Sequence, residues 1–317
     1  MGLIKKASEL NINDKIKALI YGQAGMGKTT LALSAPTPLL LDFDNGVHRV
    51  NYAHLKNVDT VQISSYQDFL DVLNNEDLSP YETFVIDTGG KALDYMSDYI
   101  IKRNPKMGKA SGTLTLQGYG ERKVEFSALV KRISQMGKHI IFVAHRDTKT
   151  EGDDTRYIPQ FGGSSYDSLV TELDLVGYME ANGRERTITF DPTSRNDGKN
   201  TCNLPSVMKV PKIVDDNGKP TAENDFMKSK VMNAYENRLA SRKLEADAYN
   251  KLIEELKENI DFINSKESAD EFVSRIEKFE HVGNSKAVAS KLLGDKTKAL
   301  GLVWNTADKQ YMEKATV

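Results

Sequence analysis

Short apolar runs alternate with helix-like spacing through the first two-thirds of the chain. Runs such as Thr83-Phe-Val-Ile-Asp87 have strand length, and Phe69, Leu70 and Leu73 recur at helical spacing. This alternation predicts an α/β fold, with a mainly parallel sheet flanked by helices. We expect strands at 17–21, 38–43, 60–64, 83–87, 139–144, 174–178 and 186–190, and helices at 28–34, 66–74 and 121–135.

The pattern changes near Pro211. A turn-rich stretch, Asp215 to Pro220, precedes a charged region with helical character. Within that region, Ser268-Ala-Asp-Glu271 fits a capping box that opens a helix. We therefore expect an α/β domain over residues 1–212, a linker over 213–225 and a helical region over 226–317.

Composition narrows the possible classes of protein. The 317 residues carry a net charge of −2, and no apolar run approaches the roughly 20 residues that span a bilayer. We expect no membrane partner and a cytoplasmic location. The one cysteine, Cys202, excludes an intrachain disulfide and a cysteine-built zinc site.

The segment from Gly22 to Thr29 matches G-x-x-x-x-G-K-[ST] in full and lies between an expected strand and an expected helix. In such a loop, backbone N–H groups point at phosphates, the lysine reaches the β- and γ-phosphates, and the hydroxyl ligates Mg²⁺. The motif therefore predicts a site for ATP and Mg²⁺. We expect nucleotide contacts from Gly22, Gln23, Ala24, Gly25, Met26, Gly27, Lys28, Thr29 and Thr30.

Acidic and histidine side chains follow three expected strands. Asp87 ends an apolar run, which would deliver its carboxylate beside Thr29 and the Mg²⁺ shell, directly or through water. Asp42 and Asp44 lie on one side of the second strand, and either is a candidate general base, with a plain Asp-Asn-Gly turn as the alternative. His145 follows the strand at 139–144 and is a candidate γ-phosphate sensor. The expected catalytic set is therefore Lys28, Asp44, Asp87 and His145.

The order of these motifs resembles a RecA-like recombinase core, most closely the phage-encoded ATP-binding recombination and single-strand annealing proteins. The resemblance rests on Gly22 to Thr29, Leu41-Asp-Phe-Asp44, Phe84-Val-Ile-Asp87, Phe142-Val-Ala-His145 and Gly162-Gly-Ser-Ser-Tyr166, in that order, and spans roughly residues 15–210. The family's water-activating residue is usually Glu, and the matching position here is Asp44. A shorter acid would have to lie closer to the water, which is compatible with slow hydrolysis.

The resemblance implies two loops that face single-stranded DNA. The first, residues 102–112, would contribute cations to phosphates, and the second, residues 146–165, charge and stacking rings. The expected DNA contacts are Lys102, Arg103, Lys106, Lys109, Lys149, Arg156, Tyr157 and Phe161. In the family a neighbouring subunit completes the ATP site, and Arg195 and Lys199 lie in the matching region, although an exposed Asp-Gly turn explains them equally well.

The sequence thus indicates a DNA-stimulated ATPase that binds single-stranded DNA as a homo-oligomer, ring or filament, and promotes strand pairing or annealing. Its setting would be a phage or its bacterial host, and its C-terminal helices are a candidate docking site for a single-strand-binding protein. Two alternatives stay open: an ATP-dependent annealing scaffold without catalysis, and a small-molecule P-loop kinase.

Overall fold

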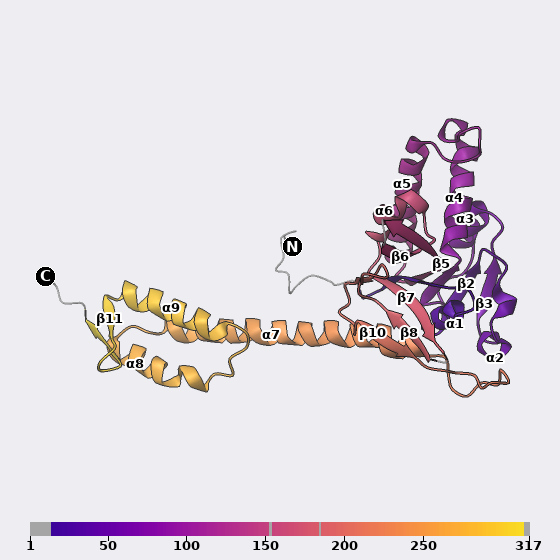
Figure 1. Ribbon diagram of the computed structural model, residues 1–317. Helices are drawn as coiled ribbons and strands as arrows, with labels where there is room; N and C mark the ends of the chain where they lie inside the picture. Colours follow the sequence, from indigo (N-terminus) through magenta and orange to yellow (C-terminus); the bar gives the residue numbers. More distant parts are fainter. Residues whose placement is uncertain (1–13, 152–153, 184, 314–317) are drawn as a thin grey trace. The chain divides into compact units, whose positions relative to one another are not determined.

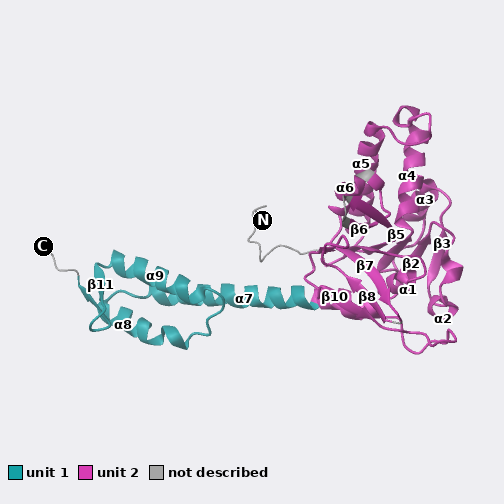
Figure 2. Ribbon diagram, viewed as in Figure 1, with its two compact units in different colours: residues 1–12, 237–317 teal, residues 13–236 magenta. Residues whose placement is uncertain are grey.

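The computed structural model describes residues 14–151, 154–183 and 185–313. The chain divides after Glu236 into two compact units, which are coloured separately in Figure 2. The first unit along the chain, magenta and labelled unit 2 in the figure, holds the glycine-rich loop and all the expected site residues. The second unit along the chain is teal and labelled unit 1.

Ten strands form one sheet in the described part of the first unit, in the order β10-β8-β7-β1-β5-β4-β2-β3, with β6 on β5 and β9 on β7. The six strands from β7 to β3 along this order are mutually parallel, whereas β8, β9, β10 and β6 pair antiparallel. The mainly parallel sheet confirms the expected fold class. The strands are β1 (Lys17–Gly22), β2 (Pro38–Asp42), β3 (Asp59–Gln62), β4 (Thr83–Asp87), β5 (His139–Glu151), β6 (Asp154–Pro159), β7 (Leu175–Asn182), β8 (Glu185–Thr189), β9 (Lys199–Asn200) and β10 (Val207–Val210).

Helices cover both faces of this sheet (Figure 1). Because side chains alternate along a strand, Leu19 and Tyr21 of β1 enter the core on one face, while Ala18 and Ile20 enter the core on the other. The first core packs against α3, α4 and α5, and the second against α1 and η5. The helical elements of this unit are α1 (Lys28–Ala32), η2 (Val47–Arg49), α2 (Tyr52–Leu55), α3 (Tyr66–Asn75), α4 (Gly89–Arg103), η3 (Pro105–Met107), α5 (Leu116–Gln135), η4 (Gly163–Ser165), α6 (Tyr166–Val170) and η5 (Met227–Met232).

Two regions differ from the sequence-based expectation. The loop expected at 146–165 is largely a β-hairpin, because β5 continues past Ala144 to Glu151 and pairs with β6. Helix α4 was not among the expected helices, because its opening Gly89-Gly90 resembles a turn. It packs beside α5, and Figure 1 shows the two helices rising together from the sheet, with η3 in their connection.

The second unit has its own apolar core. Leu256 of helix α7 (Asn233–Asp261), Phe272 of α8 (Lys266–Arg275) and Leu293 of α9 (Ser285–Ala299) belong to one buried cluster. Helix α8 begins one turn before the expected capping box, because Ser265 caps it and Ser268 is its third residue. A short turn, η6 (Ile276–Lys278), follows α8, and the hairpin of β11 (Leu302–Asn305) and β12 (Gln310–Glu313) adds strands to a region expected to be helical. Among the described helices, none combines the length and the apolar character that crossing a bilayer requires.

Candidate functional site

The glycine-rich loop joins β1 to α1 at the carboxyl edge of the parallel strands. Gly25 and Gly27 have φ angles of 78° and 87°, which suit glycine, and open space surrounds the position of a Cβ on Gly25. Lys28 is only 6% exposed, and its Nζ donates a hydrogen bond to the Gln23 carbonyl at 2.9 Å. Burial lowers the pKa of this amine, and the carboxylates of Asp87 and Asp44 oppose that effect.

Asp87 meets Thr29 where β4 ends. The Thr29 hydroxyl donates a hydrogen bond of 2.5 Å to Oδ2 of Asp87, whose side chain is buried. Burial raises the pKa of Asp87 to about 6, and the neighbouring carboxylates of Asp44 and Asp42 raise it further, against the opposing effects of the Thr29 hydrogen bond and of Lys28. A hydroxyl and a carboxylate therefore lie together beside a buried lysine.

The two aspartates after β2 have different surroundings. Asp42 is 1% exposed, and its two carboxylate oxygens accept the backbone N–H groups of Gly46 and Val47 at 3.0 and 3.1 Å. Asp44 keeps a side chain that is 20% exposed and lies 3.7 Å from the guanidinium of Arg49. Asp42 thus stabilises the turn, whereas Asp44 faces the cavity.

His145 lies beside the glycine-rich loop because β5 pairs with β1, with His145 opposite Gly22. Burial lowers the pKa of its imidazole, and the charge of Lys28 lowers it further. One cavity of about 230 Å³ is lined by the loop together with Asp44, Arg49, Asp87 and His145. Arg49 is a charged residue of this lining that was not among the expected site residues. It lies in the short turn η2, and no periodic sequence pattern shows which way the chain runs after such a turn.

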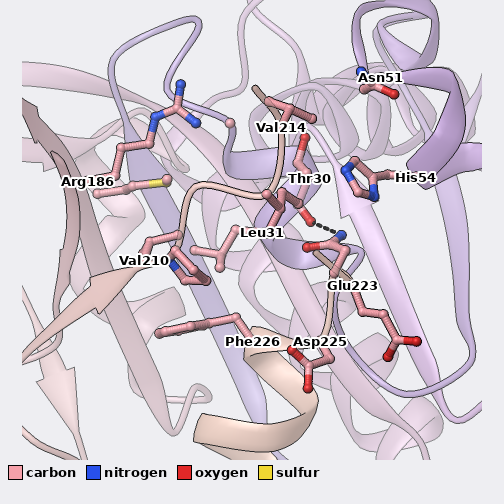
Figure 3. Close-up of a pocket in the computed structure, with 15 residues that line it drawn as sticks. Thr30, Leu31, Asn51, His54, Arg186, Val210, Val214, Glu223, Asp225 and Phe226 are labelled. Carbon is pink, nitrogen blue, oxygen red and sulfur yellow. Dashed lines mark hydrogen bonds between the residues drawn. The ribbon is translucent and has the colours of Figure 1, made fainter. Parts of the chain in front are cut away.

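A second cavity, of about 90 Å³, opens on the other side of the loop (Figure 3). It shares Gly27 and Thr30 with the first cavity and adds Arg186 from β8 and His54 from α2. Leu31, Val210 and Phe226 supply apolar surface. No local sequence pattern predicts this cavity, because its lining comes from segments far apart along the chain.

The cations of residues 102–112 that are expected to bind DNA differ in whether an ion pair within the protein engages them. Lys102, Lys106 and Lys109 are exposed near the connection of α4 and α5, and no ion pair holds them within the described residues. Arg103 forms ion pairs with Glu121 and Glu125.

The hairpin residues expected to bind DNA are mostly engaged within the protein. Phe161 is 1% exposed and packs against the rings of Phe126 and Phe142, so it has no face on which a base could stack. This burial excludes Phe161 from the DNA contacts. The Tyr157 ring stacks on Tyr178 at 5.5 Å between centroids and lies under the guanidinium of Arg146 at 4.2 Å.

The remaining cations of this region are also held. Arg156 is ion-paired with Asp197, and Lys149 also has an interaction partner within the protein. Lys199 donates hydrogen bonds to the carbonyls of Val170 and Thr171 at 3.0 and 3.1 Å. Its amine therefore caps the C-terminus of α6. Two of its three N–H donors are thus used within the subunit. Arg195 remains at the surface, with its guanidinium 5.9 Å from the Tyr157 ring.

The residues of the first cavity fit a magnesium nucleotide. Lys28 is a buried cation with one neutral hydrogen-bond acceptor, which leaves two N–H donors for anionic oxygens. Thr29 and Asp87 offer adjacent oxygens of the kind that Mg²⁺ prefers. Space around Gly25 leaves the backbone of the loop accessible to phosphate.

Comparisons with known proteins agree with this site. Residues 14–202 match a family model described as an AAA domain. A KaiC-like protein from the hyperthermophilic archaeon Pyrococcus horikoshii is 12% identical, with a TM-score of 0.33 over 55% of this chain and 77% of that chain. A second solved structure, of an ATPase domain, is 12% identical, with a TM-score of 0.35 over 63% of this chain and 81% of that chain. No curated protein matches. Because the family match spans more than half of the sequence, the chain belongs to the AAA domain family, and its glycine-rich loop has the sequence of a P-loop.

Proposed function

We propose that this protein hydrolyses ATP with Mg²⁺ at the first cavity and binds single-stranded DNA through the α4–α5 arm, by which we mean α4, α5 and the connection between them (residues 89–135). We further propose that ATP hydrolysis and DNA binding are coupled. The observation that carries the proposal is the convergence of Lys28, Thr29, Asp87, Asp44 and His145 on one cavity. A bound magnesium nucleotide would supply the phosphoryl group and the metal charge on which such a site acts. The residues of the loop, from Gly22 to Thr30, would hold it.

Each side chain has a distinct role in this proposal. Lys28 would stabilise negative charge, and its burial strengthens that interaction because little water screens it. Thr29 and Asp87 would hold the metal. His145 would contact the terminal phosphate by a hydrogen bond as a neutral imidazole, because its pKa lies below the usual value.

Asp44 is the better candidate for the general base. Both carboxylate oxygens of Asp42 already accept backbone N–H groups, so a proton there would weaken the turn. Asp44 lines the cavity, and within the described residues its carboxylate has the ion pair with Arg49 as its one partner. We expect Asp44→Asn to slow turnover by about 10²-fold or more while ATP still binds. The reverse result, with Asp42→Asn slow and Asp44→Asn normal, would exchange the two roles.

The proposed DNA site is the group of lysines near the connection of α4 and α5. Helix α4 begins next to Asp87 and Thr88 at the nucleotide cavity and ends at Arg103, so its 15 residues extend about 22 Å from the cavity to the lysines. A shift of Thr88 would therefore move Lys102 and its neighbours with the helix. The hairpin expected to provide stacking contributes less, because Tyr157 and Arg156 already have partners.

We further propose that the protein is of phage origin and promotes strand pairing or annealing as a homo-oligomer. The order of the motifs along the chain supports this proposal. Arg195 remains the candidate cation for a neighbouring subunit, and the second unit is the candidate site for a single-strand-binding protein.

The decisive experiment measures ATP turnover with and without single-stranded DNA. We expect stimulation by DNA, and no turnover in Lys28→Ala, because the cation at the phosphates is lost. Unchanged turnover in folded Lys28→Ala would contradict the assignment. DNA binding without turnover would favour the annealing scaffold, and turnover indifferent to DNA would favour the small-molecule kinase.

DNA affinity against salt concentration tests the arm itself. Each phosphate neutralised contributes about −0.7 to the slope of log affinity against log salt. Replacing Lys106 and Lys109 by Ala should flatten that slope by about 1 to 1.5. The matched control replaces Lys291 and Lys298, two exposed lysines of α9, which removes the same charge elsewhere. Equal effects of the two pairs would refute a specific arm site.

A further inference from the structure

The second cavity lies next to the cavity of the P-loop. Gly27 and Thr30 line both cavities, so a ligand held by the loop would lie directly beside the second cavity. The deeper lining is apolar, with Leu31, Val210 and Phe226 grouped in Figure 3. This arrangement suits a molecule that is anionic at one end and largely apolar at the other.

Two polar groups in this cavity have no partner among the described residues. The Arg186 guanidinium lies beside the loop, with one nitrogen 3.4 Å from the position of a Cβ on Gly27, and no ion pair or hydrogen bond holds it within that part of the chain. The Nε2 atom of His54 is buried and makes no hydrogen bond. Buried polar groups in native proteins are usually hydrogen-bonded. The unpaired Nε2 of His54 therefore indicates a missing partner, and the half-buried guanidinium of Arg186 has N–H donors to offer to the same ligand.

The outer wall is the segment between β10 and η5, which is tied to the helix of the P-loop. Asn224 donates a hydrogen bond to the Thr30 carbonyl at 2.7 Å, and the Met227 N–H donates one to the Ser34 hydroxyl at 2.8 Å. Asn51, next to α2, donates one to the Gly218 carbonyl at 2.6 Å. The wall is therefore built onto the nucleotide loop rather than merely lying across it.

We propose that this cavity binds the nucleoside part of the nucleotide, with Arg186 on the phosphate nearest the ribose and His54 on the polar edge of the base. The proposal rests on the proposed function, because it takes the phosphates to lie on the P-loop. The flat apolar faces of a base would pack against Leu31, Val210 and Phe226, and its edge would supply the partner that Nε2 of His54 lacks among the described residues. Arg186 acts as a positioning cation from the same subunit.

Binding of ATP and of inorganic triphosphate to the full-length protein, both with Mg²⁺ and measured by calorimetry, tests this assignment. His54→Ala should weaken ATP binding about three- to tenfold, the value of one hydrogen bond, and leave inorganic triphosphate binding unchanged. His54→Gln should restore most of the ATP affinity, because an amide also hydrogen-bonds. Arg186→Gln should weaken both ligands by about tenfold or more, since a charged hydrogen bond is lost.

Lys209→Gln is the matched control for Arg186. Lys209 lies on the neighbouring strand β10, and its amine pairs with Glu185 at the surface. Its replacement should therefore change the affinity for neither ATP nor inorganic triphosphate. Trypsin cleavage after the exposed Lys212, in the outer wall, should be slowed by ATP and not by inorganic triphosphate.

The outcomes separate this assignment from the proposed function. If His54→Ala weakens both ligands equally or neither, or if triphosphate protects Lys212 as well as ATP does, the cavity is not the nucleoside site, although the P-loop assignment stands. If the wild-type protein binds neither ligand, the proposed function fails and this assignment fails with it.

Discussion

Replacing Asp87 by Asn should stabilise the nucleotide-free protein while weakening its response to Mg²⁺. Burial raises the pKa of Asp87 to about 6 from the ordinary 3.8. Between these values the folded state binds more protons than the unfolded state, so this group makes stability fall as pH rises. At pH 7 the difference corresponds to about 3 kcal/mol of destabilisation. The neutral amide removes that cost, and its oxygen can still accept the Thr29 hydroxyl.

Urea unfolding gives the measurement. Far-UV circular dichroism would follow both units, and fluorescence of Trp304, the one tryptophan, would follow the second unit alone, so a dichroism transition without a matching fluorescence change belongs to the first unit. With a denaturant slope of about 2–3 kcal/mol/M, the dichroism midpoint of Asp87→Asn should rise by about 1 M at pH 7. The Trp304 transition should not move.

The pH dependence makes the test specific. At pH 5 the wild-type carboxyl is mostly protonated when folded, so the stability gain should shrink to about half. Addition of Mg²⁺ and ATP should stabilise the wild-type protein much more than the variant, because the amide is a poorer partner for the metal. A nucleotide-free variant less stable than wild type at pH 7, or a gain that does not change with pH, would refute the reasoning.

Three further predictions concern residues outside the metal site. Phe161→Ala should cost about 3–5 kcal/mol in urea unfolding, because its ring fills the core between Phe126 and Phe142; an unchanged midpoint would show that the ring is not buried. Burial lowers the pKa of His139 to about 4 from 6.5, so the folded state binds fewer protons and stability should be lost as pH falls from 6.5 to 4, by about 3 kcal/mol. This loss is best seen in Asp87→Asn, where the opposite effect of Asp87 is absent, and a flat profile there would contradict it. Lys199→Met should lower the free energy of unfolding by about 1 kcal/mol or more, because the end of α6 loses two hydrogen bonds; no change would mean that the amine does not cap the helix.

Local patterns were sufficient for the parts of the site that follow buried strands. The apolar run ending at Asp87 and the motif around Lys28 each carry their signal within a few residues, and the structure places both at one sheet edge. Parallel strands buried on both faces form continuous apolar runs, which explains why these strands could be recognised.

The parts that could not be predicted depend on polar ribbons and on distant contacts. Residues 146–151 continue β5 with polar side chains, so no apolar alternation marked the hairpin. Phe161 and Tyr157 looked like free rings because their burial depends on Phe126 and Tyr178, which come from other elements. The nucleoside cavity brings His54, Arg186 and Phe226 together, and no spacing rule connects positions more than 30 residues apart.

Strand β5 fixes the spacing between the nucleotide cavity and the hairpin. It runs without interruption from the core through His145 into the hairpin, pairing with β1 up to His145 and with β6 from Arg146 onward. Side chains alternate along such a strand, and His145 and Asp147 accordingly line one further cavity, of about 450 Å³, together with Asp44 and Thr88. Inserting a single residue after His145 would turn every following side chain of β5 to the opposite face. Such an insertion would take Asp147 away from the face on which His145 lies, whereas the insertion of two residues would restore the alternation of the following side chains.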